Sequence, residues 1–303
     1  MFTDILILRG GALGDFLLTL PALRQIRKRW PDAQLTLVGN ASAAALALRG
    51  GEIDVAFSQH EARWAALYGA APLTAELAEF LRKKDLIVCF WPDPDGEISA
   101  RFPLHPQQTF LSAPARPQSH PAARHFCEAL APLGIRNPDT FEYCLHGFKH
   151  TLSQPGKSTL ALHPGSSSAA RNWPASHWKE LGSSLLRRGH SLLLITGEAD
   201  EAQRIELSSL DCEHANGLDL TSLALRMASC DFYLGHDTGV SHLAAALGLP
   251  ALILFGPSDP KIWAPQGHGV RILCADSSLP ALQPEHVLRA ILEHPHFPEG
   301  RFQ

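Results

Sequence analysis

A chain of 303 residues, 45% hydrophobic and 18% charged, is long enough for two domains and too apolar to be intrinsically disordered. Its formal net charge of −4, without a long basic run, argues against a nucleic-acid-binding surface. The first residues include Asp4 and only a short apolar run, unlike a signal peptide, and no stretch approaches the ~18 uncharged apolar residues of a membrane-spanning helix. We therefore expect a cytoplasmic protein.

The cysteines and histidines give no sign of a disulfide framework or a metal site. The six cysteines are scattered without a C-x-x-C pair, a distribution typical of free thiols in a reducing compartment. The 16 histidines form no H-E-x-x-H motif and no i, i+4 pair with a nearby acid. We therefore expect no structural metal and no cofactor.

The first forty residues alternate between strand and helix patterns. Residues 5–8 are an uninterrupted apolar run, as the centre of a parallel sheet requires. A glycine turn that contains Gly11 and Gly14 follows, then apolar residues at helical spacing over 16–30, and a second strand pattern over 34–38. This order predicts a doubly wound α/β domain.

The same glycine turn invites comparison with dinucleotide-binding dehydrogenases, but it departs from their fingerprint twice. The spacing is G-G-x-x-G instead of G-x-G-x-x-G. The second strand ends at Val38-Gly39-Asn40, without an acidic residue for a ribose hydroxyl. A nicotinamide-dependent dehydrogenase is therefore disfavoured.

A polar linker divides the chain. Before it, the patterns predict strands over 54–57 and 86–90, helices over 75–84 and 124–133, and an irregular proline-rich loop over 91–121. Residues 152–157, LSQPGK, are polar and contain proline and glycine, as linkers between domains do. We therefore predict one domain over residues 1–154 and a second over 155–283.

The second half repeats the α/β alternation. A helix over 240–247 ends at Gly248 with Pro250 beyond it, which is a common stop signal. The other predicted helices cover 176–188, 220–228, 284–292 and a segment after Glu201, and the predicted strands cover 159–162, 192–196, 232–234, 251–255 and 270–274.

Three loops of this half follow predicted strands, where open α/β sheets bind their ligands. The first is Gly165-Ser166-Ser167-Ser168 with Arg171, the second is Gly197-Glu198, and the third is Asp237-Thr238-Gly239 with His242. The helix that begins after Asp237-Thr238-Gly239 offers backbone N–H groups and a positive dipole end, which suit an anion such as a diphosphate. Asp237 and Thr238 could equally be ordinary helix caps. Together the three loops favour a nucleoside diphosphate site.

At this point the chain resembles glycosyltransferase family 9, the ADP-heptose:lipopolysaccharide heptosyltransferases. Three motifs carry the likeness: ILILRGGALGDFLLTLPALRQIRKRWPDA, HPGSSSAARNWPASHW and DFYLGHDTGVSHLAAALGLPALILFGPSDP. The resemblance implies a GT-B fold, with two Rossmann-like doubly wound domains facing a central cleft, acceptor on the first and nucleotide sugar on the second. It also implies inverting transfer without a metal, and a last helix, within 284–303, that crosses back to the first domain.

The resemblance assigns roles to individual residues. Asp15 matches the catalytic base, although it could also be a first-turn acid favoured by the helix dipole. Arg171 matches the cation on the leaving diphosphate. The matching donor contacts are Ser166, Ser167, Thr238, Gly239 and His242, with Asp237 beside them and Gly11 and Gly14 in the glycine loop. Glu198 matches the nucleoside contact, with Asp200 as the alternative.

We therefore expect a glycosyltransferase that moves a heptose, or a related sugar, from an ADP-sugar to a lipopolysaccharide core or another cell-surface glycan precursor. Its expected partners are the nucleotide sugar and a lipid-anchored glycan, with a peripheral site on the inner membrane surface, no nucleic acid and no obligate protein partner. The alternatives are a non-catalytic nucleotide-sugar-binding protein, or a family member with another donor or a protein acceptor. Retention of Asp15 within a complete L-G-D motif favours the enzyme.

Overall fold

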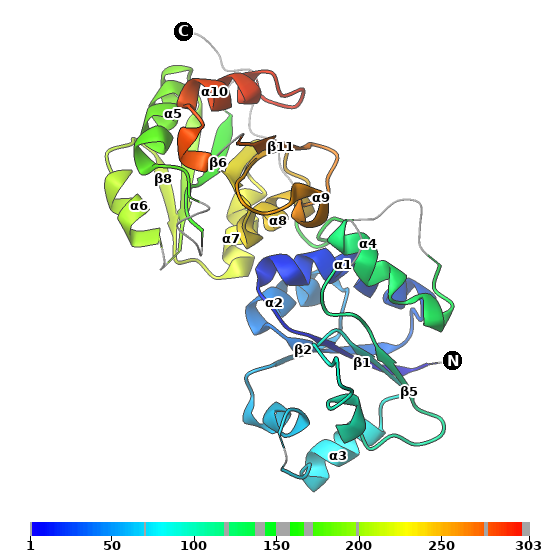
Figure 1. Ribbon diagram of the computed structural model, residues 1–303. Coiled ribbons are helices and arrows are strands. Elements are labelled where there is room, and N and C mark those ends of the chain that lie inside the picture. The colour runs from blue at the N-terminus through cyan, green and yellow to red at the C-terminus, as the bar shows by residue number, and fades with distance from the viewer. Residues whose placement is uncertain are drawn as a thin grey trace. The chain divides into compact units, whose positions relative to one another are not determined.

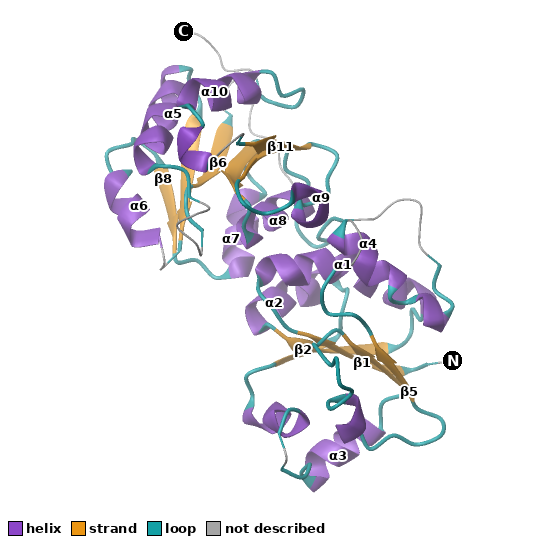
Figure 2. Ribbon diagram, viewed as in Figure 1, coloured by secondary structure: helices purple, strands orange, loops and turns teal. Residues whose placement is uncertain are grey.

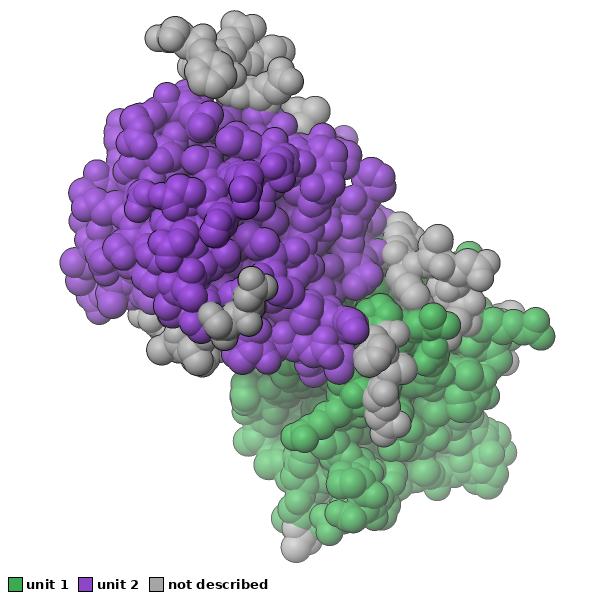
Figure 3. Space-filling model, turned by 45° about the horizontal axis from the view of Figure 1, so that its top comes forward, with its two compact units in different colours: residues 1–142 green, residues 143–303 purple. Residues whose placement is uncertain are grey.

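The computed structural model describes residues 2–69, 71–117, 121–136, 143–149, 158–166, 172–197, 200–275 and 278–298. The chain forms two compact units, Met1–Glu142 and Tyr143–Gln303, which Figure 3 colours separately. The division therefore falls before the linker that the sequence indicated, and all of that linker, residues 152–157, lies outside the described residues. Each unit is built around its own parallel sheet.

The first unit contains a five-stranded sheet in the order β3-β2-β1-β4-β5. All four strand pairings are parallel. Helices α1, α2 and α4 lie on one face of the sheet and α3 on the other (Figures 1 and 2). The strands are β1 (Asp4–Arg9), β2 (Gln34–Gly39), β3 (Val55–Ser58), β4 (Leu86–Cys89) and β5 (Thr109–Ser112), and the helices are α1 (Leu13–Arg29), α2 (Ala41–Gly50), α3 (Ala75–Arg82) and α4 (Ala122–Glu128).

The apolar run at the start of the chain forms β1, the central strand. Ile5, Leu6, Ile7 and Leu8 are all fully buried, because helices cover both faces of a strand that also has neighbours on both edges. Parallel strands place their carboxyl ends at one edge of the sheet, so the glycine turn after β1 opens at the edge where such sheets bind ligands.

The second unit contains a six-stranded parallel sheet in the order β11-β10-β9-β6-β7-β8. Its strands are β6 (Thr159–His163), β7 (Ser191–Thr196), β8 (Glu213–Asn216), β9 (Phe232–His236), β10 (Ala251–Phe255) and β11 (Val270–Cys274). Its helices are α5 (Ala175–Arg187), α6 (Glu201–Glu206), α7 (Leu220–Met227), α8 (Gly239–Ala246), α9 (Pro260–Trp263) and α10 (Pro284–Leu292). The three loops that the sequence indicated as the donor site follow β6, β7 and β9.

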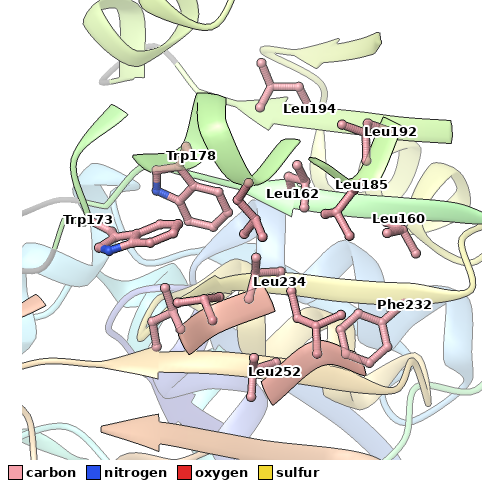
Figure 4. Packing of buried hydrophobic residues seen from close by; sticks show 14 of the residues in the cluster. Leu160, Leu162, Trp173, Trp178, Leu185, Leu192, Leu194, Phe232, Leu234 and Leu252 are labelled. Carbon is pink, nitrogen blue, oxygen red and sulfur yellow. The ribbon is translucent and has the colours of Figure 1, made fainter. Parts of the chain in front are cut away.

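The core of the second unit joins alternate residues of these strands to α5 and α10 (Figure 4). Trp173 and Trp178 pack edge to face, with ring centroids 5.3 Å apart, and the indole N–H of Trp173 donates to the carbonyl oxygen of Leu282 at 2.7 Å. This bond ties the segment before α5 to the segment before α10.

The last helix, α10, buries Val287 and Ile291 in the core of the second unit and packs on α5. A crossing back of this helix to the first domain stays a prediction. One expectation from the sequence needs correction: the stretch over 91–121 is less irregular than expected, because it contains strand β5. The expected α/β class with two doubly wound parallel sheets is confirmed.

Candidate active site

The glycine turn after β1 brings the backbone against the first turn of α1. Gly11 has φ +97°, a conformation that L side chains rarely adopt, and a Cβ there would lie 2.8 Å from Oδ2 of Asp15. The backbone N–H of Ala12 donates to that same oxygen at 3.0 Å. Gly11 therefore leaves the space in which the Asp15 carboxylate receives its backbone hydrogen bond, and Gly14 lies within the first turn of α1.

Asp15 is partly exposed, with 41% of its side chain accessible, and it stands beside a buried cation. The guanidinium of Arg9 donates through Nη2 to the carbonyl oxygen of Asp15 at 2.8 Å and through Nε to Oγ1 of Thr19 at 2.8 Å. The hydroxyl of Thr19 in turn donates to the Asp15 carbonyl at 2.9 Å. Nη2 of Arg9 also lies 3.9 Å from the Asp15 carboxylate.

Burial has the largest effect on the pKa of Arg9. Desolvation lowers the pKa of Arg9 to about 10, against an opposing effect of the Asp15 carboxylate, so the guanidinium stays charged at neutral pH. Its central carbon lies 4.5 Å from the ring centroid of Phe126, which supports the cation through the negative face of the ring. Sequence patterns had not singled out Arg9 or Thr19.

Asp15 opens on a cavity of about 470 Å³ that lies wholly within the first unit. Its wall carries two guanidinium groups, one carboxylate and several aromatic rings, so it offers both charge and flat apolar surface. Its lining includes Arg9, Gly10, Asp15, Gln59, Tyr68 and Trp91.

In the second unit, loops after neighbouring strands meet at His163, the last residue of β6. Its Nε2 lies 3.7 Å from Oδ2 of Asp200, and its Nδ1 lies 3.3 Å from Oγ1 of Thr238, the N-cap residue of α8. The loops after β6, β7 and β9 are therefore joined through one buried imidazole. His163 precedes the P-G-S-S-S run, and its position at the carboxyl end of a strand was the signal that could have identified it.

The carboxylate of Asp200 contacts both His163 and the backbone of Gly197. Burial alone would raise the pKa of Asp200, but the nearby imidazoles of His163 and His236 and a hydrogen bond from the Gly197 N–H lower it below its usual value. Oδ2 accepts from the Gly197 N–H at 2.8 Å, and a Cβ on Gly165 would collide with the carboxylate. Asp200 therefore holds the loops after β6 and β7 together, and a nucleoside contact by Glu198, or by Asp200 as the alternative, stays a prediction.

The remaining donor-site candidates differ in accessibility. Asp237 is buried, while Thr238 and Gly239 at the start of α8 are partly exposed. Ser166 is partly exposed and donates through Oγ to Oδ1 of Asn172 at 2.7 Å. Three expected contacts lie outside the described residues: Ser167, Arg171 and Glu198.

His242 faces the protein interior. Its Nδ1 lies 2.8 Å from the hydroxyl of Tyr143, both side chains are buried, and burial lowers the pKa of His242 to about 4. The imidazole is therefore neutral at neutral pH and cannot supply a positive charge to a phosphate. A phosphate contact by His242 stays a prediction, and the geometry limits it to a neutral hydrogen bond.

Across the described ranges, no group of three or more histidine, cysteine, aspartate or glutamate side chains is arranged to hold a metal ion. Within the same ranges, no helix has both the length and the apolar character needed to span a membrane.

The chain has two doubly wound parallel units. One carries an acid at its glycine turn, and the other carries polar loops at the carboxyl ends of β6, β7 and β9. This is the architecture of GT-B glycosyltransferases. A sequence model of glycosyltransferase family 9 (heptosyltransferase) matches residues 117–290, more than half of the chain. The chain therefore belongs to this family, and the expected class of enzyme, a glycosyltransferase, is confirmed.

Similar proteins are named heptosyltransferases. Lipopolysaccharide heptosyltransferase 1 of Escherichia coli K12 is 24% identical over 289 residues, covering 85% of this chain and 89% of the relative. Lipopolysaccharide heptosyltransferase 1 of Pseudomonas aeruginosa is 35% identical over 111 residues, and that match spans only 36% of this chain and 31% of the relative.

Solved structures show the same fold. The E. coli heptosyltransferase WaaC with ADP superposes with a TM-score of 0.76 at 23% identity, covering 96% of this chain and all (100%) of that one. E. coli ADP-heptose lipopolysaccharide heptosyltransferase II gives a TM-score of 0.74 at 19% identity, with 96% and 98% coverage.

Proposed function

We propose that this protein transfers a heptose from ADP-heptose to a lipopolysaccharide core or another cell-surface glycan precursor, with inversion at the anomeric carbon and without a metal ion. The observation that carries the proposal is Asp15: a partly exposed carboxylate, fixed by the Ala12 N–H, beside the buried cation of Arg9 and on the wall of a cavity. Membership of family 9 supplies the reaction class.

The acid accounts for the acceptor half of the reaction. A free oxygen of the Asp15 carboxylate accepts the proton of an acceptor hydroxyl while the hydroxyl oxygen attacks the anomeric carbon of the donor. The bond from that carbon to the leaving phosphate oxygen breaks, and its electron pair goes to ADP. A single attack from the face opposite the leaving group inverts the configuration.

The second unit accounts for the leaving group. The start of α8, with Thr238 at its N-cap position, presents the positive end of a helix dipole near the loops after β6 and β7. Arg171, which the family motif places on the diphosphate, would add a full charge. Fixed positive groups of this kind stabilise developing charge on a leaving diphosphate, and this is the basis for proposing a metal-independent reaction.

The acceptor is lipid-linked, so the enzyme would work at the inner membrane surface. Two residues at the end of α1 are already engaged within the protein and are not free to contact a membrane. Trp30 is only 5% exposed, and Arg27 is engaged by the carbonyl oxygen of Ala33 and the carboxylate of Asp54. Of the residues at the end of α1, Lys28 and Arg29 are exposed and available to anionic lipid, an attraction of about 1 kcal/mol each.

Transfer is tested with ADP-heptose and deacylated lipopolysaccharide core extract, with ADP release and acceptor mass as the two readouts. The proposal expects ADP release that depends on acceptor, survives EDTA, and is lost in Asp15→Ala. Donor binding without either hydrolysis or transfer, in wild type as in Asp15→Ala, would instead identify a nucleotide-sugar-binding protein. Loss of activity with EDTA, restored by Mg²⁺, would contradict metal independence.

A further inference from the structure

Two aromatic side chains form one wall of the cavity that holds Asp15. The rings of Tyr68 and Trp91 have centroids 5.0 Å apart and are inclined by 30°. Tyr68 is 57% exposed, whereas Trp91 is 2% exposed. The tryptophan therefore supports the tyrosine from behind, and Tyr68 presents its ring to the cavity side of the pair.

The Tyr68 ring is exposed and at the same time supported by a second ring. It is among the few large hydrophobic side chains of the described residues that remain exposed. The Tyr68 side chain has only two rotatable bonds, and the Trp91 ring behind it limits its rotation further. A ligand that stacks on Tyr68 therefore costs little side-chain entropy of the tyrosine.

Polar groups lie beside the rings. The indole N–H of Trp91 is buried and has no hydrogen-bond partner among the described residues. A Cβ on Gly10 would lie 3.4 Å from that nitrogen and 2.7 Å from Oε1 of Gln59, so the glycine leaves space next to both atoms. Gln59 is held by its backbone, whose N–H donates to the Gly39 carbonyl at 2.8 Å.

We infer that this wall is a subsite for a sugar ring of the acceptor, with Tyr68 as the stacking platform and Trp91 and Gln59 as its polar contacts. One face of a pyranose carries C–H bonds with partial positive charge, which the negative face of an aromatic ring attracts, while its edge carries hydroxyls. A buried N–H without a partner and a carboxamide at the edge of the platform suit those hydroxyls. The ligand class is a cyclic carbohydrate.

The placement connects this subsite to catalysis, and that connection rests on the proposed function. Asp15 lines the same cavity as Tyr68, Trp91 and Gln59. A ring seated on Tyr68 would bring one of its hydroxyls to the carboxylate that takes the proton. Tyr68 and Trp91 are then positioning residues for the acceptor, without a role in proton transfer.

Binding is tested on the full chain without donor, by saturation-transfer difference NMR with methyl β-D-glucopyranoside and methyl α-D-mannopyranoside. Sorbitol, which has hydroxyls but no ring face, is the negative probe. We expect ring-proton signals from at least one glycoside and none from sorbitol. Tyr68→Ala should abolish the signals and Tyr68→Phe should keep them, because only the ring is needed.

A matched pair of variants tests the indole N–H. Trp91→Phe keeps an aromatic ring behind Tyr68 but removes the donor. Trp64→Phe removes another buried indole N–H that has no hydrogen-bond partner within the described ranges, and Trp64 does not line the cavity. Glycoside binding should weaken in Trp91→Phe and stay unchanged in Trp64→Phe. In the transfer assay, Tyr68→Ala should raise the acceptor KM about tenfold and leave the donor KM unchanged.

The outcomes separate this inference from the proposed function. Glycoside binding that depends on Tyr68, in a protein that transfers no heptose, supports the subsite and contradicts the function. Heptose transfer with an acceptor KM that Tyr68→Ala leaves unchanged, or sorbitol signals as strong as those of the glycosides, overturns the subsite. So does the absence of signals from both glycosides.

Discussion

The carbonyl oxygen of Asp15 accepts a hydrogen bond from Nη2 of Arg9 at 2.8 Å, so the last residue of β1 fixes the first turn of α1 from within the protein. Asp15 thus receives two kinds of support. Its backbone is held by a buried cation, and its carboxylate is held by the Ala12 N–H, which leaves the side chain little freedom although it is partly exposed. Such pre-organisation is what a general base requires.

Thr19→Val tests this support. The substitution keeps the volume but removes the hydroxyl that accepts from Nε of Arg9 and donates to the Asp15 carbonyl. A buried charged donor is left without its acceptor, so we expect the free energy of unfolding to fall by about 2 kcal/mol. Urea titration measures it, with Thr221→Val, at a partly exposed helix position, as the control. A loss equal to that of the control would mean that the hydroxyl contributes nothing.

Gly11→Ala tests the glycine turn, and Gly51 provides a matched control. Both residues have positive φ, +97° and +75°, so alanine should cost about 1–2 kcal/mol of stability at either position. Only at Gly11 would the added Cβ meet Asp15, at 2.8 Å from Oδ2, whereas nothing lies within 4 Å at Gly51. We therefore expect kcat to fall at least about tenfold in Gly11→Ala alone, since a misplaced base loses rate. Equal kcat in the two variants would show that the conformation of the glycine turn does not affect the catalytic step.

His242 should make the protein sensitive to acid. Burial lowers the pKa of His242 to about 4 in the folded state, while the unfolded chain takes up the proton near 6.5. The unfolded state therefore binds more protons between these values, and the stability that the neutral imidazole contributes is lost as pH falls from about 6.5 to 4. His242→Asn should reduce the loss of unfolding free energy between pH 7 and 5 by about 2 kcal/mol.

The control for that measurement is His286→Asn, which removes an exposed histidine on α10. The change in the slope of stability against pH should be larger for His242→Asn than for this control. Parallel slopes for wild type and His242→Asn would show that the imidazole titrates normally in the folded state.

The sequence predicted the central strands because strands buried on both faces need continuous apolar runs, as in β1 and β10. It did not predict β8, whose residues Glu213–Asn216 are mostly polar and exposed, because an edge strand has less need of apolar side chains. The helix α2, with alanines on its buried face, was also missed, since alanine gives little hydrophobic periodicity.

For the candidate site, motifs indicated Asp15 and Thr238 but not the residues that hold them. Arg9 reaches the Asp15 carbonyl only because β1 ends beneath the first turn of α1. His163 meets Asp200 because β6 and β7 are adjacent in the sheet, a pairing that the order of elements along the chain does not specify. Tertiary contacts of this kind depend on sheet order and are not visible as a local pattern.

Asp15→Asn tests the proposed chemistry directly. The amide keeps the shape of the side chain, and its oxygen can still accept from the Ala12 N–H, so the first turn of α1 should stay intact. The amide has no useful basicity, and we expect kcat to fall by at least ~10²-fold, the usual scale for a lost general base. ADP affinity, measured by calorimetry, should remain within about twofold, because Asp15 belongs to the first unit and the proposed donor loops to the second. A variant that kept most of its turnover would exclude Asp15 as the base. A variant that lost ADP binding as severely as rate would make Asp15 a structural residue of the donor site instead.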